Sequence, residues 1–197
     1  SISRQRIWGV PLPLFVSKKT NEPLKDQEVI ENIANIFEKE GADCWFVDDS
    51  QKFLGKKYKK EDYIKSNDIV EVWFDSGATH SYVLEKRKDL HWPASMYLEG
   101  SDQHRGWFQS SLLTSVGMYD HAPYKGVLTH GFTVDERGHK MSKSLGNVVE
   151  PKKIYKTLGA DVLRLWVAAT DYRAEMSVSH EILTRVSDAY RSLRNLS

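Results

Sequence analysis

Two short strand patterns separated by a helical pattern constrain the fold of this 197-residue chain more than any other feature. Residues 96–98 are apolar and predict a strand, and a second strand pattern spans residues 126–133. Between them the apolar residues recur every four positions, as in a helix, at Phe108, Leu112 and Val116. A strand, a glycine turn and a helix form the α/β arrangement, in which ligands bind at strand carboxyl ends and helix amino ends. The sequence therefore predicts an α/β fold.

Polar residues and glycines follow each of the two strand patterns. Glu99, Gly100 and Asp102 come after the first, and His130 and Gly131 come at the end of the second. Gly100 lets the backbone approach a ligand closely. Asp102 is open to two interpretations, a helix N-cap or an acceptor for ribose hydroxyls, whereas Glu99 is harder to explain as a cap. We expect a ligand site along these strand ends.

A cationic loop follows the second strand pattern. Residues 140–144 read Lys-Met-Ser-Lys-Ser and lie between Gly138 and Gly146. Ammonium groups, hydroxyls and free backbone N–H groups suit an anion with several oxygens, although a solvated surface turn has the same composition. Residues 121–160 hold seven Lys and Arg against three acids, a local +4 in a chain of net charge +1. Positive potential is thus concentrated around this loop.

Composition narrows the class of protein. The 28 basic and 27 acidic residues nearly cancel, which argues against a surface that coats nucleic acid. The lysine run at 56–60 is open to two interpretations, a solvated loop or a local RNA-facing patch. Cys44 is the only cysteine, which excludes an intrachain disulfide and fits a reducing cytosol; a core side chain and a catalytic thiol both remain open. No run of about 18 apolar residues predicts a membrane span.

The first half of the chain predicts a small α+β layer at residues 15–95. An amphipathic helix at 27–40 has Asp26 as its cap and Gly41 at its end, with strands expected at 44–47 and 69–74. We expect a further helix from the turn at 75–77 to about residue 90. Pro11 and Pro13 favour an extended segment at the start, which presents Trp8 at a bend, toward either a core or a ligand.

The last part of the chain predicts three helices. Pro151 suits a first helical turn, and that helix ends at Gly159. A second helix spans residues 160–169. Ser179 caps a third, whose apolar stripe needs a partner and comprises Ile182, Leu183, Val186, Ala189, Tyr190 and Leu193.

Taken together, these segments resemble a known family. Residues 140–144 resemble the KMSKS loop of class I aminoacyl-tRNA synthetases, and the stretches 4–9, 72–77, 99–108 and 128–132 are similar to those of the isoleucyl-tRNA synthetases. The similarity covers essentially all 197 residues. Valine enzymes resemble the chain generally but differ in the Trp-Phe-Asp-Ser and Gly-Ser-Asp-Gln blocks, so a valine-type relative is one alternative. A non-catalytic tRNA-binding module is another.

The resemblance implies a domain organisation. Residues 96–150 would be the second half of a Rossmann-like catalytic domain, and residues 1–14 the chain re-entering it after an editing insertion. Residues 15–95 would be an inserted α+β connective region, and 151–197 the start of a helical bundle that contacts the tRNA stem and anticodon. The family's His-Ile-Gly-His motif and the editing insertion are absent from the 197 residues, and the chain starts without Met. We therefore expect a segment of a longer, monomeric, cytoplasmic protein that is inactive alone.

The resemblance also implies a reaction. Isoleucine would attack the α-phosphorus of ATP, bound with Mg²⁺, to give isoleucyl-adenylate and pyrophosphate, and the aminoacyl group would then pass to tRNA(Ile). We expect no metal site in this chain, although zinc could be held elsewhere in a full-length protein.

By the same resemblance, each motif residue receives an expected role. Two indoles would line the isoleucine side-chain pocket, Trp8 and Trp107. The aminoacyl-adenylate would contact Glu99, Gly100, Asp102 and Gln103, and ATP would adjoin His130 and Gly131. The loop residues Met141, Ser142 and Ser144 would bind ATP or the adenylate. Catalysis would depend on Lys143, supported by Lys140, through stabilisation of charge on the leaving pyrophosphate.

Overall fold

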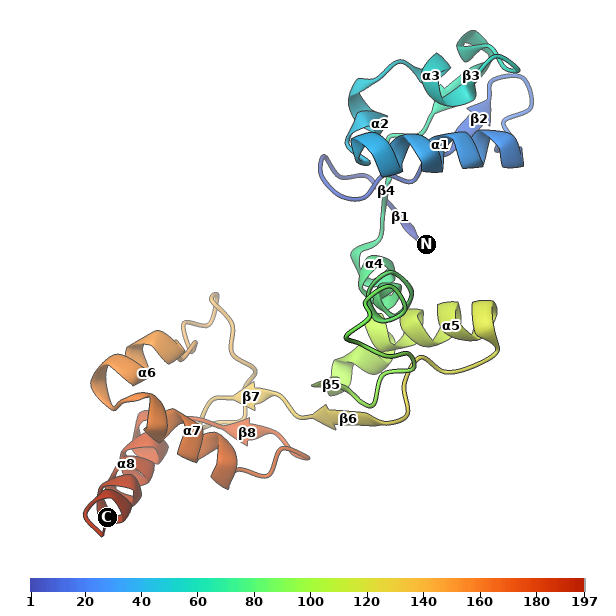
Figure 1. Ribbon diagram of the computed structural model, residues 1–197. Helices are drawn as coiled ribbons and strands as arrows, with labels where there is room; N and C mark the ends of the chain where they lie inside the picture. Colours follow the sequence, from blue (N-terminus) through green and yellow to red (C-terminus); the bar gives the residue numbers. More distant parts are fainter. Residues whose placement is uncertain (197) are drawn as a thin grey trace. The chain divides into compact units, whose positions relative to one another are not determined.

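The computed structural model describes residues 1–196, and the chain forms two compact units (Figure 1). The first unit comprises residues 1–92 and 106–123. The second comprises residues 93–105 and the chain from Tyr124 onward. Each unit has its own sheets, and the domain boundaries expected after residues 14, 95 and 150 remain predictions.

The first unit begins with a small α+β layer. Helix α1 (Gln27–Glu40) starts where the Asp26 side chain accepts a hydrogen bond from Glu28 N and ends at Gly41, as predicted. It lies beside the antiparallel pair of β2 (Phe15–Ser17) and β3 (Tyr63–Lys65) (Figure 1). Three short turns complete the layer: α2 (Cys44–Val47), α3 (Ser50–Leu54) and the 3-10 turn η1 (Lys60–Asp62).

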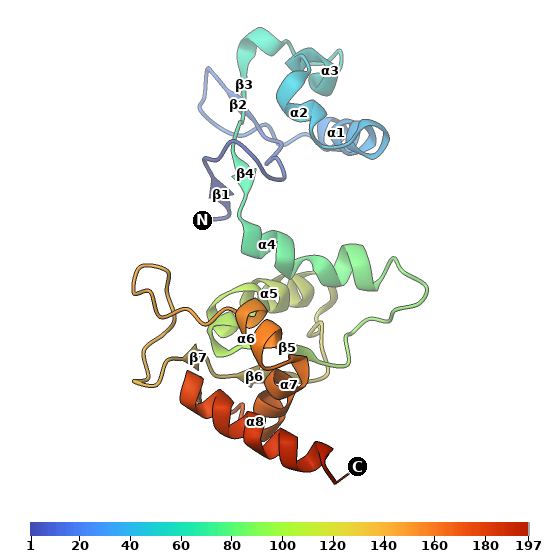
Figure 2. The same ribbon diagram turned by 90° about the vertical axis from the view of Figure 1, so that its left-hand side faces the viewer.

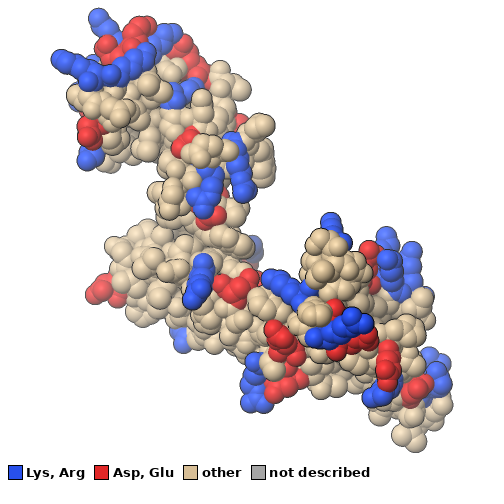
Figure 3. Space-filling view, turned by 180° about the vertical axis from the view of Figure 1, so that it is seen from behind, with Lys and Arg blue, Asp and Glu red and all other residues tan. Residues whose placement is uncertain are grey.

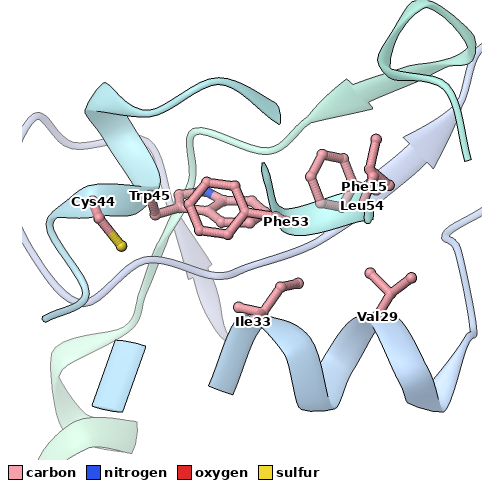
Figure 4. Packing of buried hydrophobic residues seen from close by; sticks show 7 residues of the cluster. All are labelled: Phe15, Val29, Ile33, Cys44, Trp45, Phe53 and Leu54. Carbon is pink, nitrogen blue, oxygen red and sulfur yellow. The ribbon is translucent and has the colours of Figure 1, made fainter. Parts of the chain in front are cut away.

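An aromatic core holds this layer together (Figure 4). Trp45 and Phe53 are fully buried, with ring centres 4.9 Å apart, and Trp45 Nε1 donates to Ser66 O at 2.8 Å. The other buried members are Phe15, Val29, Ile33, Cys44 and Leu54. Burial raises the pKa of the Cys44 thiol, so the structure supports the core interpretation of this cysteine over a reactive thiol.

Two secondary-structure predictions in this unit are wrong. Residues 44–47 form helix α2, not a strand, because a helical turn buries the consecutive residues Cys44 and Trp45 while Val47 is 81% exposed. The strand expected at 69–74 is only β4 (Ile69–Val70), which pairs antiparallel with β1 (Ser3–Arg4). Helix α4 (Val72–Gly77) begins immediately afterwards, because the Glu71 side chain accepts from Trp73 N and caps it.

The helix expected to continue to residue 90 is also shorter. A π-helical turn, η2 (His80–Leu84), follows α4 and ends the helical region early. Helix α5 (Trp107–Tyr119) packs on α4. The contact is close at Gly77, where a Cβ atom would lie 2.4 Å from Ser110 Oγ. Ser110 Oγ in turn donates to Trp73 O at 2.5 Å, which ties the start of α5 to α4.

The second unit contains two parallel strand pairs. Strand β5 (Tyr97–Gly100) pairs with β6 (Val127–His130), and β7 (Thr133–Val134) pairs with β8 (Met176–Ser177). The single strand expected at 126–133 is therefore wrong, since it divides at Gly131. Gly131 N donates to Tyr172 O at 2.9 Å, which turns the chain from one pair to the other.

Three helices complete the second unit, close to their predicted limits: α6 (Pro151–Thr157), α7 (Ala160–Ala169) and α8 (His180–Arg194). Ser179 Oγ caps α8 by accepting from Ile182 N at 3.2 Å. Helices α7 and α8 pack together (Figure 2) around a core of Ile154, Trp166, Val178 and Leu183. In the described part of the chain, every helix is too short or too polar to cross a membrane.

Candidate active site

The predicted ligand residues at the strand ends lie together in the second unit. The parallel register of β5 and β6 places Gly100 opposite His130 and Glu99 opposite Thr129. His130 Nδ1 lies 2.9 Å from Gly131 O. A carbonyl oxygen only accepts, so Nδ1 is the donor and Nε2 of the neutral ring is left as an acceptor. Two backbones and an imidazole therefore meet at one sheet edge.

Asp102 lies beside Gly100. A Cβ atom at Gly100 would lie 2.7 Å from Asp102 Oδ1 and 3.8 Å from His130 Cε1. The N-cap interpretation of Asp102 is wrong, because residues 101–105 form the 3-10 turn η3 (Ser101–Arg105) and α5 starts after Gly106. Asp102 and Glu99 are exposed, while Gln103 is buried. The two carboxylates are thus accessible hydrogen-bond acceptors.

The lysine loop is anchored by its methionine. A tight turn with Gly138 at φ 77° reverses the chain, so that Lys140 forms an antiparallel β-bridge with Val134. Met141 packs against the core formed by α6, α7 and α8, whereas Lys140 and Lys143 are exposed. Ser142 Oγ accepts from Leu145 N at 3.2 Å and lies 3.1 Å from Ser144 Oγ. The contact of Met141 with the core therefore fixes the loop, while the side chains of Lys140 and Lys143 remain exposed to solvent.

One ammonium group of the loop has an aromatic partner. Lys140 Nζ lies 4.3 Å from the centre of the Phe132 ring, a cation–π distance. Phe132 follows Gly131 in the link between β6 and β7, so this contact joins the lysine loop to the strand-end residues. Phe132 lies in the family-like stretch 128–132, and its contact with Lys140 was not expected from the sequence.

Asp135 and Asn147 hold the two ends of the loop together. This pair was not expected from the sequence. Asn147 Nδ2 donates to Asp135 Oδ2 at 2.9 Å, and Asn147 Oδ1 accepts from Ser142 N at 2.9 Å. The amide of Asn147 and two backbone N–H groups lower the pKa of the Asp135 carboxyl. A useful signal was present in the sequence, because Asp135 precedes the turn at Gly138 and Asn147 follows Gly146, and Asp and Asn side chains at turns typically bond to the turn backbone.

The two predicted indoles belong to the first unit. Trp8 is 87% exposed and lines a cleft of about 550 Å³ whose other lining residues include Arg4, Arg6, Glu71 and Trp73. Trp107 is the first residue of α5 and is half-buried, with its ring centre 4.6 Å from that of Phe108. For Trp8 the core interpretation is wrong, because the side chain is solvent-accessible.

Comparison with known proteins decides the family. Residues 1–179 match the family described as tRNA synthetases class I (I, L, M and V). The chain belongs to this family. The expected class I synthetase resemblance is thus confirmed, and the chain is a class I tRNA synthetase domain of mixed helix and strand content.

Curated relatives of this class I domain are isoleucine–tRNA ligases. Those of Pelagibacter ubique and Alkalilimnicola ehrlichii are each 63% identical over 98% of this chain, and that of Zymomonas mobilis is 57% identical over 98%. The chain spans only 20–21% of the length of these relatives. Their names favour the isoleucine type over the valine-type alternative.

A solved class I structure has a similar fold. It is a LeuRS of Agrobacterium radiobacter K84 in a ternary complex with tRNA and LeuAMS, with a TM-score of 0.70 and 22% identity. The match covers 100% of this chain and 27% of the LeuRS chain. At this identity the likeness concerns the fold alone.

The surface of the class I domain gives little support to a separate nucleic-acid patch at the lysine run 56–60. Lys57 pairs with Asp26 at 2.6 Å, and Lys60 pairs with Asp49 at 2.5 Å. On the face shown in Figure 3, basic and acidic side chains lie beside one another. The solvated-loop interpretation of this run therefore fits the structure better.

Among the described residues, one group has metal-ligand chemistry. Glu40, Cys44 and Asp48 have ligand atoms within 4.8 Å of one another. Lys52 Nζ already lies 2.6 Å from both carboxylates, and the pKa of this lysine is raised by these two hydrogen bonds. The ammonium group occupies the place of a cation, so this cluster is a structural ion pair.

Proposed function

We propose that this chain forms the part of an isoleucine–tRNA ligase that binds ATP and isoleucyl-adenylate and stabilises the leaving pyrophosphate. The observation that carries this proposal is the combination, within one compact unit, of the strand ends at Gly100 and His130 and the anchored loop with exposed Lys140 and Lys143. This unit is proposed to be the second half of a Rossmann-like catalytic domain, since the β5–β6 pair is parallel and its polar residues follow the strand ends.

The strand-end residues are assigned to the nucleoside and aminoacyl part of the adenylate. Glu99 and Asp102 accept hydrogen bonds only, so they suit ribose hydroxyls or the substrate ammonium group and would repel phosphate. Gly100 and Gly131 keep the sheet edge free of side chains, and His130 offers Nε2 as an acceptor. Gln103 is assigned to the same ligand through its amide.

The lysine loop is assigned to the phosphates. When isoleucine attacks the α-phosphorus, negative charge develops on the pyrophosphate, and Lys143, supported by Lys140, stabilises this charge. The Mg²⁺ that accompanies ATP, as part of the substrate, neutralises further phosphate charge. Ser142 and Ser144 supply hydroxyl donors, and Met141 fixes the loop through its contact with the core.

The proposal also covers the isoleucine pocket and the tRNA that accepts the aminoacyl group. Trp8 and Trp107 are assigned to the isoleucine side chain, for which large rigid apolar surfaces are suited. The exposure of Trp8 on its cleft supports a ligand-facing role. The aminoacyl group is then transferred to tRNA(Ile). We further propose that this chain holds no metal of its own and that any zinc would be bound elsewhere in a full-length ligase.

The test is ATP–pyrophosphate exchange by a full-length isoleucine–tRNA ligase that carries these 197 residues. We expect Lys143→Ala to lower the exchange rate by about 10²–10³-fold, the size of effect of removing one preorganised donor. Lys152→Ala, an exposed lysine on α6, is the matched control and should change the rate less than two-fold. Exchange by Lys143→Ala within a few-fold of the unchanged enzyme would sink the assignment. Exchange driven by valine better than by isoleucine would refute the choice of amino acid.

A further inference from the structure

The amide of Asn147 joins three parts of the lysine loop. Its Nδ2 donates to Asp135 Oδ2 at 2.9 Å and lies 3.4 Å from Lys140 O, while its Oδ1 accepts from Ser142 N at 2.9 Å. Asp135 follows β7, Lys140 and Ser142 belong to the loop itself, and Asn147 follows Gly146 at its far end. A single side chain thus closes the loop onto the end of the sheet.

The orientation of this amide is fixed by its partners. Asp135 Oδ1 is already occupied, since it accepts from Arg137 N at 2.9 Å and from His139 N at 2.8 Å. Oδ2 is therefore the atom that receives Asn147 Nδ2. A flipped amide would place its oxygen against a carboxylate and its NH₂ group against the N–H of Ser142, so both hydrogen bonds would be lost.

We infer that Asn147, oriented by Asp135, is a positioning residue that sets the geometry of Lys140 and Lys143 for the phosphates of ATP. This inference rests on the proposed function, because it concerns the ligand of the same loop. Asn147 acts through the backbone of Ser142, which lies between the two lysines and directly precedes Lys143. The side chain of Asn147 is half-buried, and its role is to hold the loop, not to contact the reacting atoms.

Single substitutions should disrupt the pair because each creates a repulsive contact. Asn147→Asp places two carboxylates at the distance that now separates an amide nitrogen from an oxygen. In Asp135→Asn, Asn147 keeps its oxygen toward Ser142 N, and residue 135 keeps its oxygen toward Arg137 N and His139 N. The NH₂ groups of the two amides then face each other. In each case, polar atoms that were paired become unsatisfied, which costs more than the net value of the bond.

The double exchange should restore the network. With Asp135→Asn and Asn147→Asp together, residue 135 keeps an oxygen for Arg137 N and His139 N and gains an NH₂ group toward residue 147. The new carboxylate at 147 accepts from that group and from Ser142 N. Two weak contacts are lost, the one from residue 147 to Lys140 O at 3.4 Å and the one between His139 Nδ1 and Asp135 Oδ2 at 3.6 Å.

The experiment measures KM for ATP, KM for isoleucine and kcat in ATP–pyrophosphate exchange by the full-length ligase that carries these residues. We expect each single variant to have kcat/KM for ATP reduced about ten-fold or more, with KM for isoleucine changed less than two-fold. The double exchange should return kcat/KM for ATP to within about three-fold of the original. Single variants that match the unchanged enzyme, or a double exchange no better than the single ones, would overturn the inference.

A pH profile gives a readout that a merely structural role would not move. Two carboxylates in contact cannot both remain ionised easily, so one pKa of the pair is raised and a shared proton restores a hydrogen bond at lower pH. Activity of Asn147→Asp relative to the unchanged enzyme should rise as the pH falls from 8 to 6, and the double exchange should show no such rise. Asp135 and Asn147 line a cleft whose other charged or titratable residues, present in all variants, are Glu136, Arg137, His139 and His180. A relative activity that is flat with pH would contradict the inference.

The same measurements separate this inference from the proposed function. If Lys143→Ala also leaves exchange unchanged, the loop does not bind phosphate and the proposed function fails. If Lys143→Ala is impaired while the Asp135 and Asn147 variants are not, only the positioning role fails.

Discussion

The ammonium group of Lys140 lies 4.3 Å from the centre of the Phe132 ring. The ring belongs to the link between β6 and β7, and the lysine belongs to the loop proposed to bind phosphates. This contact therefore joins two segments of the candidate site that are proposed to bind different parts of the ligand.

Replacing Phe132 tests the importance of this contact. Phe132→Leu keeps the apolar bulk but removes the π face, so Lys140 should be held less firmly and KM for ATP should rise about two- to five-fold, as expected for a cation–π interaction of ordinary strength. Phe132→Tyr retains the ring and is the control. Steady-state exchange assays of the full-length ligase give both values. An unchanged KM for ATP in Phe132→Leu would show that the ring does not matter.

Gly77 provides a test of the packing between α4 and α5. A Cβ atom there would lie 2.4 Å from Ser110 Oγ and 2.7 Å from Ser111 N, so Gly77→Ala should force the helices apart. We expect a loss of about 1–3 kcal/mol in the free energy of unfolding, the usual cost of overpacking. Urea denaturation of the 197-residue chain measures this change.

The control for this substitution lies on the other helix of the pair. Gly117 is in α5, and a Cβ atom there would meet nothing within 4 Å. Gly117→Ala should therefore stabilise the chain by about 0.5–1 kcal/mol through helix propensity. Equal effects of the two substitutions would contradict the proposed steric cause at Gly77.

The stability of the first unit should depend on pH through Asp26. Hydrogen bonds from Lys57 and Tyr58 lower the pKa of Asp26 from 3.8 to about 2. A carboxyl group whose pKa is lower in the folded state stabilises the fold fully at pH values above its unfolded-state pKa. This stabilisation is lost as the pH falls through the folded-state pKa. Asp26→Asn keeps an N-cap side chain but removes the charge.

The expected result is convergence of the two proteins in acid. The unchanged chain should be more stable than Asp26→Asn at pH 6, and the difference should shrink between pH 4 and pH 2. Denaturation midpoints are measured at several pH values for both proteins. The difference between the two midpoints at each pH isolates the contribution of the Asp26 carboxylate. A difference that is constant over the range would disprove the role of the charge.

The isolated 197-residue chain should not catalyse isoleucine-dependent pyrophosphate exchange. The reason is that the family's His-Ile-Gly-His motif is absent from these 197 residues, as is the editing insertion. The measurement is an exchange assay at high chain concentration, with a full-length isoleucine–tRNA ligase as the positive control. Exchange above background would contradict the prediction.

The sequence was informative where local signals agreed. Helices α1, α7 and α8 have strong apolar periodicity or clear end signals, and their predicted limits match the structure closely. The errors lie in short apolar runs. Residues 44–47 fit a strand or a helical turn equally well, and only packing around Trp45 decides between them.

The candidate site was predictable as a set of residue types but not as a geometry. Gly100 and His130 are 30 positions apart, and their pairing depends on the register of β5 and β6. The network of Asp135 and Asn147 needs the fold of the loop, and no single residue in it signals its partner. The resemblance supplied the expected roles of the lysines, whereas the contacts of Met141 and Phe132 are visible only in three dimensions.

Gly131 is under a packing constraint that holds whether or not this residue also contacts a ligand. A Cβ atom at this position would lie 2.1 Å from Ala174 O, and no rotamer of any other amino acid avoids that atom. In a mutational scan, residue 131 should accept glycine alone, whether or not ATP is present during selection. Invariance at this position would therefore record the passage of one backbone past another, and it would not by itself be evidence that residue 131 contacts ATP.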